Sequence, residues 1–322
     1  MTHAPLETRL PDTGPLRETV LRLAEAGARV ADLVARGPLA GDLDAAVGDS
    51  GAHEAGDAQK HLDLVADRLF HEALAGAPVA WLASEERAEV EALAPGAPLA
   101  VALDPLDGSS NIAVNAPLGA IFSILPAIDD PLASFLRPGA AQVAAGFLVF
   151  GPTTALVLTL GAGVDRFVLD REAGRFRLAQ AGVRIPTQTR EFAINASNRR
   201  HWAPGLRAFF DDCLLGREGA LGADQNMRWI ASLVAEAYRI LVRGGVFLYP
   251  ADARRGYEAG RLRRLYEASP MAFVVEQAGG RATDDRGARI LDQAPASLHQ
   301  RTPLVFGSAD MVGMVARYVA RA

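Results

Sequence analysis

The amino-acid sequence predicts an α/β fold, and three observations lead to this prediction. Segments with apolar residues at helical spacing alternate with short apolar runs that are bounded by Gly, Pro and Asp, as is typical of strands. The chain has 322 residues, enough for roughly two domains or one large α/β unit at about 150 residues per domain. Half of the residues are hydrophobic and 22% are charged, a balance that excludes intrinsic disorder as the main state.

Two helices and two strands are predicted in the first third of the chain. Apolar residues recur at helical spacing over residues 16–36 and again over residues 57–74. Gly27 weakens the first helix, because glycine lowers helix stability by about 1 kcal/mol relative to alanine. The runs at 78–82 and 99–103 are too short for helices, and the second is apolar throughout, as expected for a strand buried on both faces.

The middle of the chain is predicted to form consecutive strands of a mixed or antiparallel sheet. Each strand is a short apolar run set off by Gly, Pro or Asp, and the runs cover residues 120–125, 146–150, 155–160, 166–169 and 176–178. The pattern becomes polar over 181–191. We therefore expect an N-terminal α/β domain over 1–185 and a C-terminal α/β domain over 186–322.

Helices dominate the last third of the sequence. Apolar residues at helical spacing predict a helix over 227–242, which ends at two glycines before a strand over 246–249. A further helix is predicted with Ser269 as its N-cap and Pro270 as its first helical residue.

Charge and cysteine content exclude several classes of function. Lys and Arg number 33 and Asp and Glu number 38, a formal net charge of −5, so no broad positive field draws the protein to nucleic acid or to an anionic membrane. The single cysteine, Cys213, excludes an intrachain disulfide and a multi-thiolate metal site. The sequence shows neither a secretory signal pattern nor a membrane-length apolar stretch, and we expect a cytoplasmic protein.

The most informative segment follows the buried strand directly and reads Asp104-Pro105-Leu106-Asp107-Gly108-Ser109-Ser110-Asn111. Its two aspartates are three residues apart in a turn shaped by proline and glycine, so they can converge on one point, and the Leu106 carbonyl adds a third hard oxygen. Gly108, Ser109 and Ser110 offer backbone N–H groups and hydroxyls to an anion. A solvated turn is the alternative, because Asp-Gly is also a common hairpin signal.

Glu85 and Glu86 provide the context that favours a site over a simple turn. They also follow an apolar strand, and parallel strands bring the loops at their carboxyl ends into one crevice. Four acidic side chains in one crevice repel one another strongly unless they protonate or hold cations. All candidate ligands are oxygens and no zinc-type histidine pattern accompanies them, so we expect Mg²⁺ or Mn²⁺ rather than zinc.

Several common catalytic patterns are absent from the sequence. No G-x-G-x-x-G opens a helix, and neither a P-loop nor a G-x-S-x-G elbow occurs. The six histidines are scattered and indicate no His-based nucleophile. Acidic oxygen ligands beside a Gly/Ser anion cradle remain, a combination that suits metal-assisted phosphoryl transfer to water.

These motifs resemble those of a known group of enzymes. Ser84-Glu85-Glu86 together with the Asp-Pro-Leu-Asp-Gly-Ser-Ser-Asn motif is similar to the signature of the Mg²⁺-dependent, lithium-sensitive sugar and inositol phosphatases. The segments 244–250, 263–273 and 299–303 resemble class 1 fructose-1,6-bisphosphatases in particular. The resemblance implies a layered α-β-α-β-α sandwich with mixed sheets. It also implies hydrolysis of the 1-phosphate of fructose 1,6-bisphosphate to fructose 6-phosphate and phosphate, in gluconeogenesis or the Calvin cycle.

The resemblance assigns roles to individual residues. About two or more Mg²⁺ ions per subunit are implied, and the implied ligands are Glu85, Asp104, Asp107, Glu267 and the carbonyl of Leu106. The residues implied to orient and deprotonate the attacking water are Asp57, Asp63 and Glu86. Those implied to bind the substrate are Asp107, Gly108, Ser109 and Ser110 at the cleaved phosphate, and Asn195, Arg228, Tyr249 and Arg261 elsewhere.

Quaternary structure is also part of the resemblance. Arg228 is implied to reach the site of a neighbouring subunit, and hence a homo-oligomer, commonly a tetramer, is expected. The chain departs from the family pattern at three positions, because Arg261 replaces a lysine and both Trp229 and Asn198 replace a tyrosine. Arg261 keeps the cation but presents a planar fork, which alters how it meets the sugar.

Regulation by AMP is expected to be lost. Many family members bind AMP through a Lys-Tyr pair on the strand that leads into the Asp-Pro-Leu-Asp motif. In this chain the stretch 98–103 has neither residue, and the loss of a charge-assisted contact to a phosphate dianion removes much of the affinity. AMP should therefore leave activity largely unchanged, unless Arg22 or Arg29 rebuilds the site.

Two alternative functions exist for the same motifs. A sedoheptulose-1,7-bisphosphatase or a dual-specificity sugar bisphosphatase fits the same motifs, because the residues do not set the length of the sugar. A non-catalytic sugar-phosphate sensor is disfavoured, since binding alone does not need the water-activating carboxylates.

Overall fold

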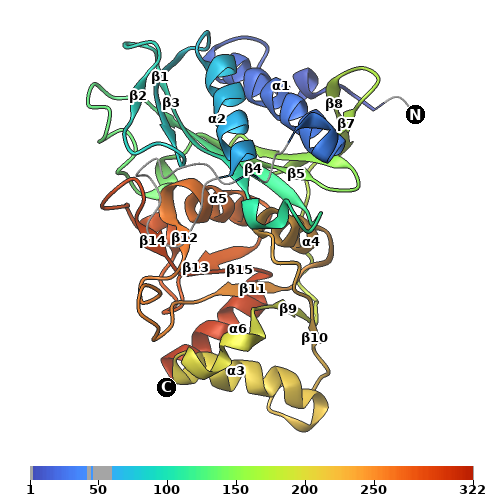
Figure 1. Cartoon of the computed structure of the whole chain (residues 1–322). Coiled ribbons are helices and arrows are strands. Elements are labelled where there is room, and N and C mark those ends of the chain that lie inside the picture. Colours follow the sequence, from blue (N-terminus) through green and yellow to red (C-terminus); the bar gives the residue numbers. More distant parts are fainter. Residues whose placement is uncertain (1–2, 42–44, 46–59, 322) are drawn as a thin grey trace.

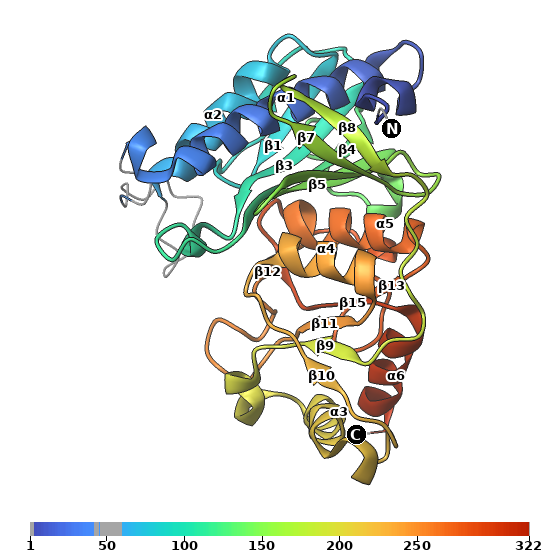
Figure 2. The same cartoon turned by 90° about the vertical axis from the view of Figure 1, so that its right-hand side faces the viewer.

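Two β-sheets are separated by helices and covered by further helices on their outer faces (Figure 1). The computed structural model describes residues 3–41, 45 and 60–321. Figure 2 shows the layers edge-on: α1 (Pro15–Arg36) and α2 (His61–Leu74) outside the first sheet, α4 (Leu233–Arg243) and α5 (Ser269–Gln277) between the sheets, and α3 (Pro204–Leu215) and α6 (Ala309–Ala320) outside the second. This arrangement confirms the expected α-β-α-β-α sandwich.

The first sheet has eight strands in the order β2-β1-β3-β4-β5-β6-β7-β8. They are β1 (Val79–Ser84), β2 (Glu91–Ala92), β3 (Leu99–Asp107), β4 (Leu118–Pro126), β5 (Ala144–Phe150), β6 (Thr154–Thr159), β7 (Asp165–Asp170) and β8 (Arg175–Gln180). β1 and β3 are parallel, and the other neighbours are antiparallel. The predicted run of consecutive strands is confirmed in β4 to β8, and the parallel pair brings the carboxyl ends of β1 and β3 to one edge.

The second sheet is mixed and has the order β10-β9-β11-β15-β13. Its strands are β9 (Glu191–Ala193), β10 (Asn226–Met227), β11 (Val246–Tyr249), β13 (Arg281–Thr283) and β15 (Leu304–Gly307), while β12 (Leu262–Arg263) and β14 (Arg301–Thr302) form a separate ribbon. The two main sheets lie on either side of residue 185, but α4 and α5 contact both of them. The division into two domains at this residue therefore stays a prediction.

Helix α5 is the apolar centre of the molecule. Every residue from Ser269 to Val275 is buried, as expected for a helix that meets a sheet on both sides. One core cluster combines α5 with Ile121 and Phe147 of the first sheet and Phe306 of the second. Both sheets thus bury their inner faces against the same layer of helices.

Gly27 has a packing role that outweighs its low helix propensity. A Cβ added at this position would lie 2.4 Å from Cδ2 of Leu148 on β5. The glycine therefore lets α1 approach the sheet closely. The same face of α1 buries Val20, Leu23 and Val30, and this burial offsets the local cost of glycine.

The helix predicted over 227–242 begins too early. Met227 instead pairs with β9 as part of β10, and α4 begins at Leu233. Ser232 defines this start, because its side chain accepts a hydrogen bond from the backbone N–H of Ala235. An edge strand and a capping serine therefore replace the first turns of the predicted helix.

Two further local predictions are wrong. Ser269 is not an N-cap, because a π-helical turn over Arg264–Ala268 precedes it and continues into α5. The predicted turn that begins at Asp104 is instead the end of β3, which runs on to Asp107. Both changes affect residues that were expected to carry chemistry.

Candidate active site

Three carboxylates from distant parts of the chain meet at the end of β3. Asp104, Asp107 and Glu267 each place an oxygen within 4.8 Å of the others, and all three are buried. On a regular strand, side chains three residues apart point to opposite faces. The register between β3 and β4 shifts between Asp104 and Asp107, and such an irregularity allows both carboxylates to face the same side.

Glu267 reaches the cluster from the π-helical turn that precedes α5. Its carboxylate accepts a hydrogen bond from the backbone N–H of Arg263. Turns of this kind are rare and are concentrated at functional sites. This one places a carboxylate at the edge of the first sheet, although the helix that follows is apolar.

Strand β1 brings Glu85 and Glu86 to the same edge. β1 is parallel to β3, and the Glu85 N–H donates to the Leu103 carbonyl at 2.9 Å, immediately before Asp104. Both glutamates are buried, and the Glu85 carboxylate forms an ion pair with the guanidinium of Arg263. The structure therefore brings the two acidic motifs into one site, as the strand-end argument predicts.

Burial and mutual repulsion raise the pKa values of the clustered carboxylates. Burial, and then the charges of Glu85, Asp107 and Glu267, raise the pKa of Asp104 well above its ordinary value. Burial, followed by the charge of Glu85, likewise raises the pKa of Glu267. Burial raises the pKa of Asp107 to about 7, although a hydrogen bond from the Val234 N–H at 3.2 Å opposes this shift. Such a cluster binds protons or a cation, and its all-oxygen donor set fits a hard divalent cation.

A cavity of about 390 Å³ contains most of the predicted site. The predicted residues that line it are Asp63, Glu85, Glu86, Asp104, Leu106, Asp107, Gly108, Ser109, Ser110, Tyr249, Arg261 and Glu267. Gly108 has φ +84°, a left-handed conformation that favours glycine, and it starts a short turn over Ser109–Asn111. The Asn111 amide donates to the carbonyls of Pro117 and Ala231, which fixes this turn beside the carboxylates.

The residues predicted to act on water come from the start of α2 and the end of β1. The Asp63 carboxylate accepts a hydrogen bond from the Lys60 N–H at 2.7 Å, and its side chain lines the cavity. Glu86 lines the same cavity. Asp57 lies outside the described residues.

A second cavity, of about 130 Å³, adjoins the first. Tyr249 and Arg261 line both cavities. Asn195 lines the second, where its Oδ1 accepts hydrogen bonds from the backbone N–H and the hydroxyl of Ser197. Two adjoining cavities, with acidic metal-type ligands in one of them, suit a ligand with two anionic ends.

Arg228 is the predicted substrate residue that lines neither of these two cavities. Its side chain is 51% exposed, and its Nε lies 3.9 Å from the Glu191 carboxylate. The next residue, Trp229, stacks in parallel on Phe247 and Tyr249, with ring centroids 5.9 and 6.2 Å away. The segment therefore supports the shared wall of the cavities through Trp229 while Arg228 points elsewhere.

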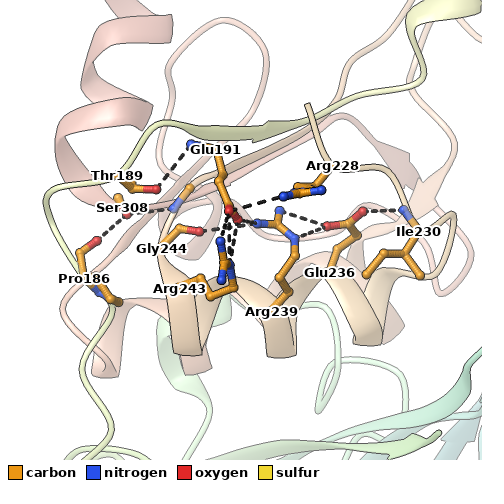
Figure 3. A network of polar contacts seen from close by, with 11 residues as sticks. Pro186, Thr189, Glu191, Arg228, Ile230, Glu236, Arg239, Arg243, Gly244 and Ser308 are labelled. Atoms are coloured by element: carbon orange, nitrogen blue, oxygen red, sulfur yellow. Dashed lines mark hydrogen bonds and ion pairs between the residues drawn. The ribbon is translucent and has the colours of Figure 1, made fainter. Parts of the chain in front are cut away.

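A buried ionic network holds the segment that carries Arg228 (Figure 3). Arg239 bridges two carboxylates, donating to Glu191 at 2.8 Å and to Glu236 at 2.9 Å. Glu236 is fully buried and also accepts a hydrogen bond from the Ile230 N–H at 2.6 Å. The network ties α4 to β9 and to the chain that follows β10.

Sequence reasoning missed several residues that line the site. Arg263 lines the first cavity, and Arg254 and Tyr257 line the second. For Arg254 and Tyr257 the sole signal was a charged, glycine-containing loop between two strands, and such loops are normally solvated. Glu191 and Glu236 belong to no recognisable motif. Their ion pairs with Arg239 become apparent when the fold is known.

The layered fold and the oxygen-lined acidic cluster place the protein in the class of α/β enzymes with a site for a divalent cation at the end of a sheet strand. A family model described as fructose-1-6-bisphosphatase, N-terminal domain, matches residues 12–181, and one described as the C-terminal domain matches residues 185–320. The chain belongs to the fructose-1,6-bisphosphatase family, which confirms the resemblance seen in the motifs.

The similarity to known proteins covers nearly the whole chain. A fructose-1,6-bisphosphatase class 1 of Nitrobacter hamburgensis is 57% identical over 293 residues, which cover 91% of this chain and 84% of that protein. One of Paracoccus denitrificans is 55% identical and covers 99% of this chain and 94% of its own length. The crystal structure of Leishmania major fructose-1,6-bisphosphatase in holo form has a TM-score of 0.91 at 31% identity and covers 100% of both chains.

None of the helices in the described part of the chain combines the length and the apolar character needed to cross a bilayer.

Proposed function

We propose that the protein hydrolyses the 1-phosphate of fructose 1,6-bisphosphate and releases fructose 6-phosphate and inorganic phosphate. The adjoining cavities carry this proposal. One contains the carboxylate cluster beside the Gly108–Ser110 turn, and the other is reached past Tyr249 and Arg261. A sugar bisphosphate that spans both has one phosphate at the reactive end and the other held away from it. The similar class 1 fructose-1,6-bisphosphatases support the same substrate.

The proposed cation is Mg²⁺, and the residues that would hold it are Glu85, Asp104, Asp107, Glu267 and the Leu106 carbonyl. Each phosphate carries about −1.5 to −2 charges at pH 7, and the ligands add further negative charge. When bound, Mg²⁺ supplies the positive charge that stabilises the phosphoryl oxygens during in-line displacement. Backbone N–H groups keep the carboxylates oriented: Leu106 donates to Asp104 at 3.0 Å, and Val234 donates to Asp107.

The remaining roles fall to groups around this cluster. We propose that Asp63 and Glu86, with Asp57, orient the attacking water and accept its proton. The backbone N–H groups and hydroxyls of Gly108–Ser110 bind the oxygens of the cleaved phosphate. Asn195, Tyr249 and Arg261 bind the rest of the substrate, and their position on the second cavity supports this role.

We also propose a homotetramer in which Arg228 completes the distal part of a neighbouring subunit's site. Its exposure, and the fact that it lines neither of the two cavities of its own chain, support this arrangement. A further similar structure, with a TM-score of 0.86 at 30% identity, is described as Leishmania major fructose-1,6-bisphosphatase in T-state. Light scattering after size-exclusion chromatography measures the subunit number. The cytoplasmic location stays a prediction.

Phosphate release at steady state tests the proposed function. Purified protein should hydrolyse fructose 1,6-bisphosphate with Mg²⁺ and lose activity after chelation, and Glu85→Gln should lower kcat/KM at least a hundredfold while the fold is retained. Glu276→Gln is the matched control, because Glu276 pairs with Arg289 and lines neither of the two cavities. Turnover by Glu85→Gln within tenfold of wild type would reject the metal-site assignment. A higher kcat/KM for sedoheptulose 1,7-bisphosphate would replace the proposed substrate.

A further inference from the structure

The loop between β11 and β12 forms one wall of the second cavity and contains an arginine that no motif identifies. Arg254, Tyr257 and Arg261 all line this cavity, which Asn195 and Asn198 also line. The Arg254 side chain is 32% exposed, so it is half-buried at the cavity rather than extended into solvent. Its neighbour Arg255 is exposed and does not line the cavity.

The Arg254 guanidinium is fixed in place by an ion pair. Its Nε and Nη2 donate to both oxygens of Asp252, whose side chain is 4% exposed. Although burial alone would raise the pKa of Asp252, hydrogen bonds from Arg254 lower it below its ordinary value, so the carboxylate is ionised. Among the described residues, none accepts a hydrogen bond from the Arg254 Nη1, which leaves donors for a ligand.

The Tyr257 ring holds the two arginines of this wall together. The Arg254 Cζ lies 4.3 Å from the ring centroid and the Arg261 Cζ lies 4.8 Å from it, both within the range of a cation–π contact. Two guanidinium groups close to one another repel, and the negative face of an aromatic ring offsets part of this repulsion. The ring therefore allows two cationic side chains to lie next to one another on this wall of the cavity.

The backbone of the loop is rigid enough to present these groups. The Asp252 N–H donates to the Tyr257 carbonyl at 3.1 Å, and the Tyr257 N–H donates to the Arg254 carbonyl at 3.0 Å. The Ala253 N–H donates to the carbonyl of His201, which joins the loop to the segment that carries Asn198. A site built on cross-linked backbone loses little entropy when its ligand binds.

We propose that Arg254 is a further substrate-binding residue, which binds the distal phosphate of the sugar bisphosphate together with Arg261, and that Asp252 and Tyr257 are its positioning residues. This inference rests on the proposed function, because it takes the second cavity as the distal end of the same substrate. The planar guanidinium explains why an arginine suits this position. Asp252 holds the edge formed by Nε and Nη2, and Nη1 donates to a phosphate oxygen.

Binding of fructose 6-phosphate, measured by calorimetry, tests the proposal without turnover. This product retains the distal phosphate and lacks the cleaved one. Arg254→Gln should raise its Kd about tenfold, the loss expected for one charge-assisted hydrogen bond. Arg255→Gln, the matched control from the adjacent position, should bind as the wild type does. Equal Kd values for wild type and Arg254→Gln would overturn the proposal.

Kinetics separate a binding role from a structural one. Arg254→Gln should raise the KM for fructose 1,6-bisphosphate about tenfold with kcat within about twofold, because the contact is made equally in the ground and transition states. Cleavage of a sugar 1-phosphate that has no second phosphate should be unaffected. An equal loss with both substrates would show that Arg254 supports the fold of the site and does not bind the distal phosphate.

Tyr257 provides a second test in which every charge is kept. Tyr257→Leu removes the aromatic face and should weaken fructose 6-phosphate binding about threefold, and Tyr257→Phe should recover most of that loss. Equal binding by the Leu and Phe variants would reject the positioning role. If the wild type binds fructose 6-phosphate through Arg254 but does not hydrolyse the bisphosphate, the proposed function fails and this site stands. If it hydrolyses the bisphosphate and Arg254→Gln behaves as wild type, the site fails and the function stands.

Discussion

Replacement of Asp107 by asparagine is expected to stabilise the metal-free protein at pH 8 and to abolish its metal-dependent activity. Burial raises the pKa of Asp107 from 3.8 to about 7 in the folded protein. The folded state therefore binds this proton more tightly than the unfolded state, and the free energy of unfolding falls as pH rises from about 4 to about 7. A difference of about 3 pKa units corresponds to about 4 kcal/mol.

The asparagine carries no charge to desolvate, and its Oδ1 can still accept the hydrogen bond from the Val234 N–H. We expect Asp107→Asn to recover about 2 kcal/mol of the loss at pH 8, because the side-chain amide must itself find partners in the site. At pH 4 the two proteins should be nearly equal in stability, since the aspartate is then protonated. The difference should grow through pH 7 and then stay constant.

Urea denaturation in excess chelator at a series of pH values measures this effect. Added Mg²⁺ should stabilise the wild type more than the variant, because a ligand stabilises the state that binds it. Asp67→Asn is the matched control with the opposite sign: Asp67 is also buried, but it accepts hydrogen bonds from Ser84 and Arg87, so its loss should destabilise the protein at pH 8. A less stable Asp107→Asn protein in chelator at pH 8 would refute the reasoning.

Three further predictions concern the substrate and its regulation. Arg228→Ala should raise KM about tenfold while kcat stays within about twofold, because a contact to the distal phosphate supplies uniform binding; an unchanged KM in steady-state assays removes Arg228 from the site. Glu236→Leu should destabilise the protein by about 3 kcal/mol in thermal melts, because it leaves Arg239, whose side chain is 10% exposed, without one of its carboxylates; a loss below about 1 kcal/mol would contradict this. AMP titrated at saturating Mg²⁺ should leave turnover largely unchanged, since Arg22 and Arg29 are already engaged in ion pairs; cooperative inhibition at micromolar AMP is the contrary result.

Local sequence is sufficient to predict a helix or strand when its apolar pattern fits one kind of secondary structure. The run at 99–103 has no polar residue, and β3 is buried at every position. The segment 227–232 has two interpretations, because apolar residues at helical spacing are also present there. Pairing of Met227 with β9 and stacking of Trp229 on Phe247 select the extended form. Both partners are distant in the sequence, so no local pattern could have decided between the forms.

Some residues of the site could also be predicted from local sequence, and others could not. Carboxylates that directly follow apolar strands are improbable in a core unless they bind something, and this made Glu85 and Asp104 predictable. Arg263 lies 178 residues from Glu85 and pairs with it through the ribbon next to the site. An arginine in the sequence does not by itself indicate such a pairing. A cation that compensates a buried carboxylate can be recognised when the fold is known, and sequence spacing does not give it.

The layer formed by α4 and α5 has a consequence for how the protein is made. The first sheet is complete at residue 180, but its inner face is covered by helices that end at residues 243 and 277. Ile121, Phe147 and Val157 are each at most 1% exposed, and they share one core cluster with those helices. During synthesis, this face would stay open to solvent until nearly 100 further residues had left the ribosome, an interval in which aggregation competes with folding. Residues 1–185 expressed alone should therefore aggregate, and a soluble fragment that unfolds cooperatively would show that the first sheet can bury this face by itself.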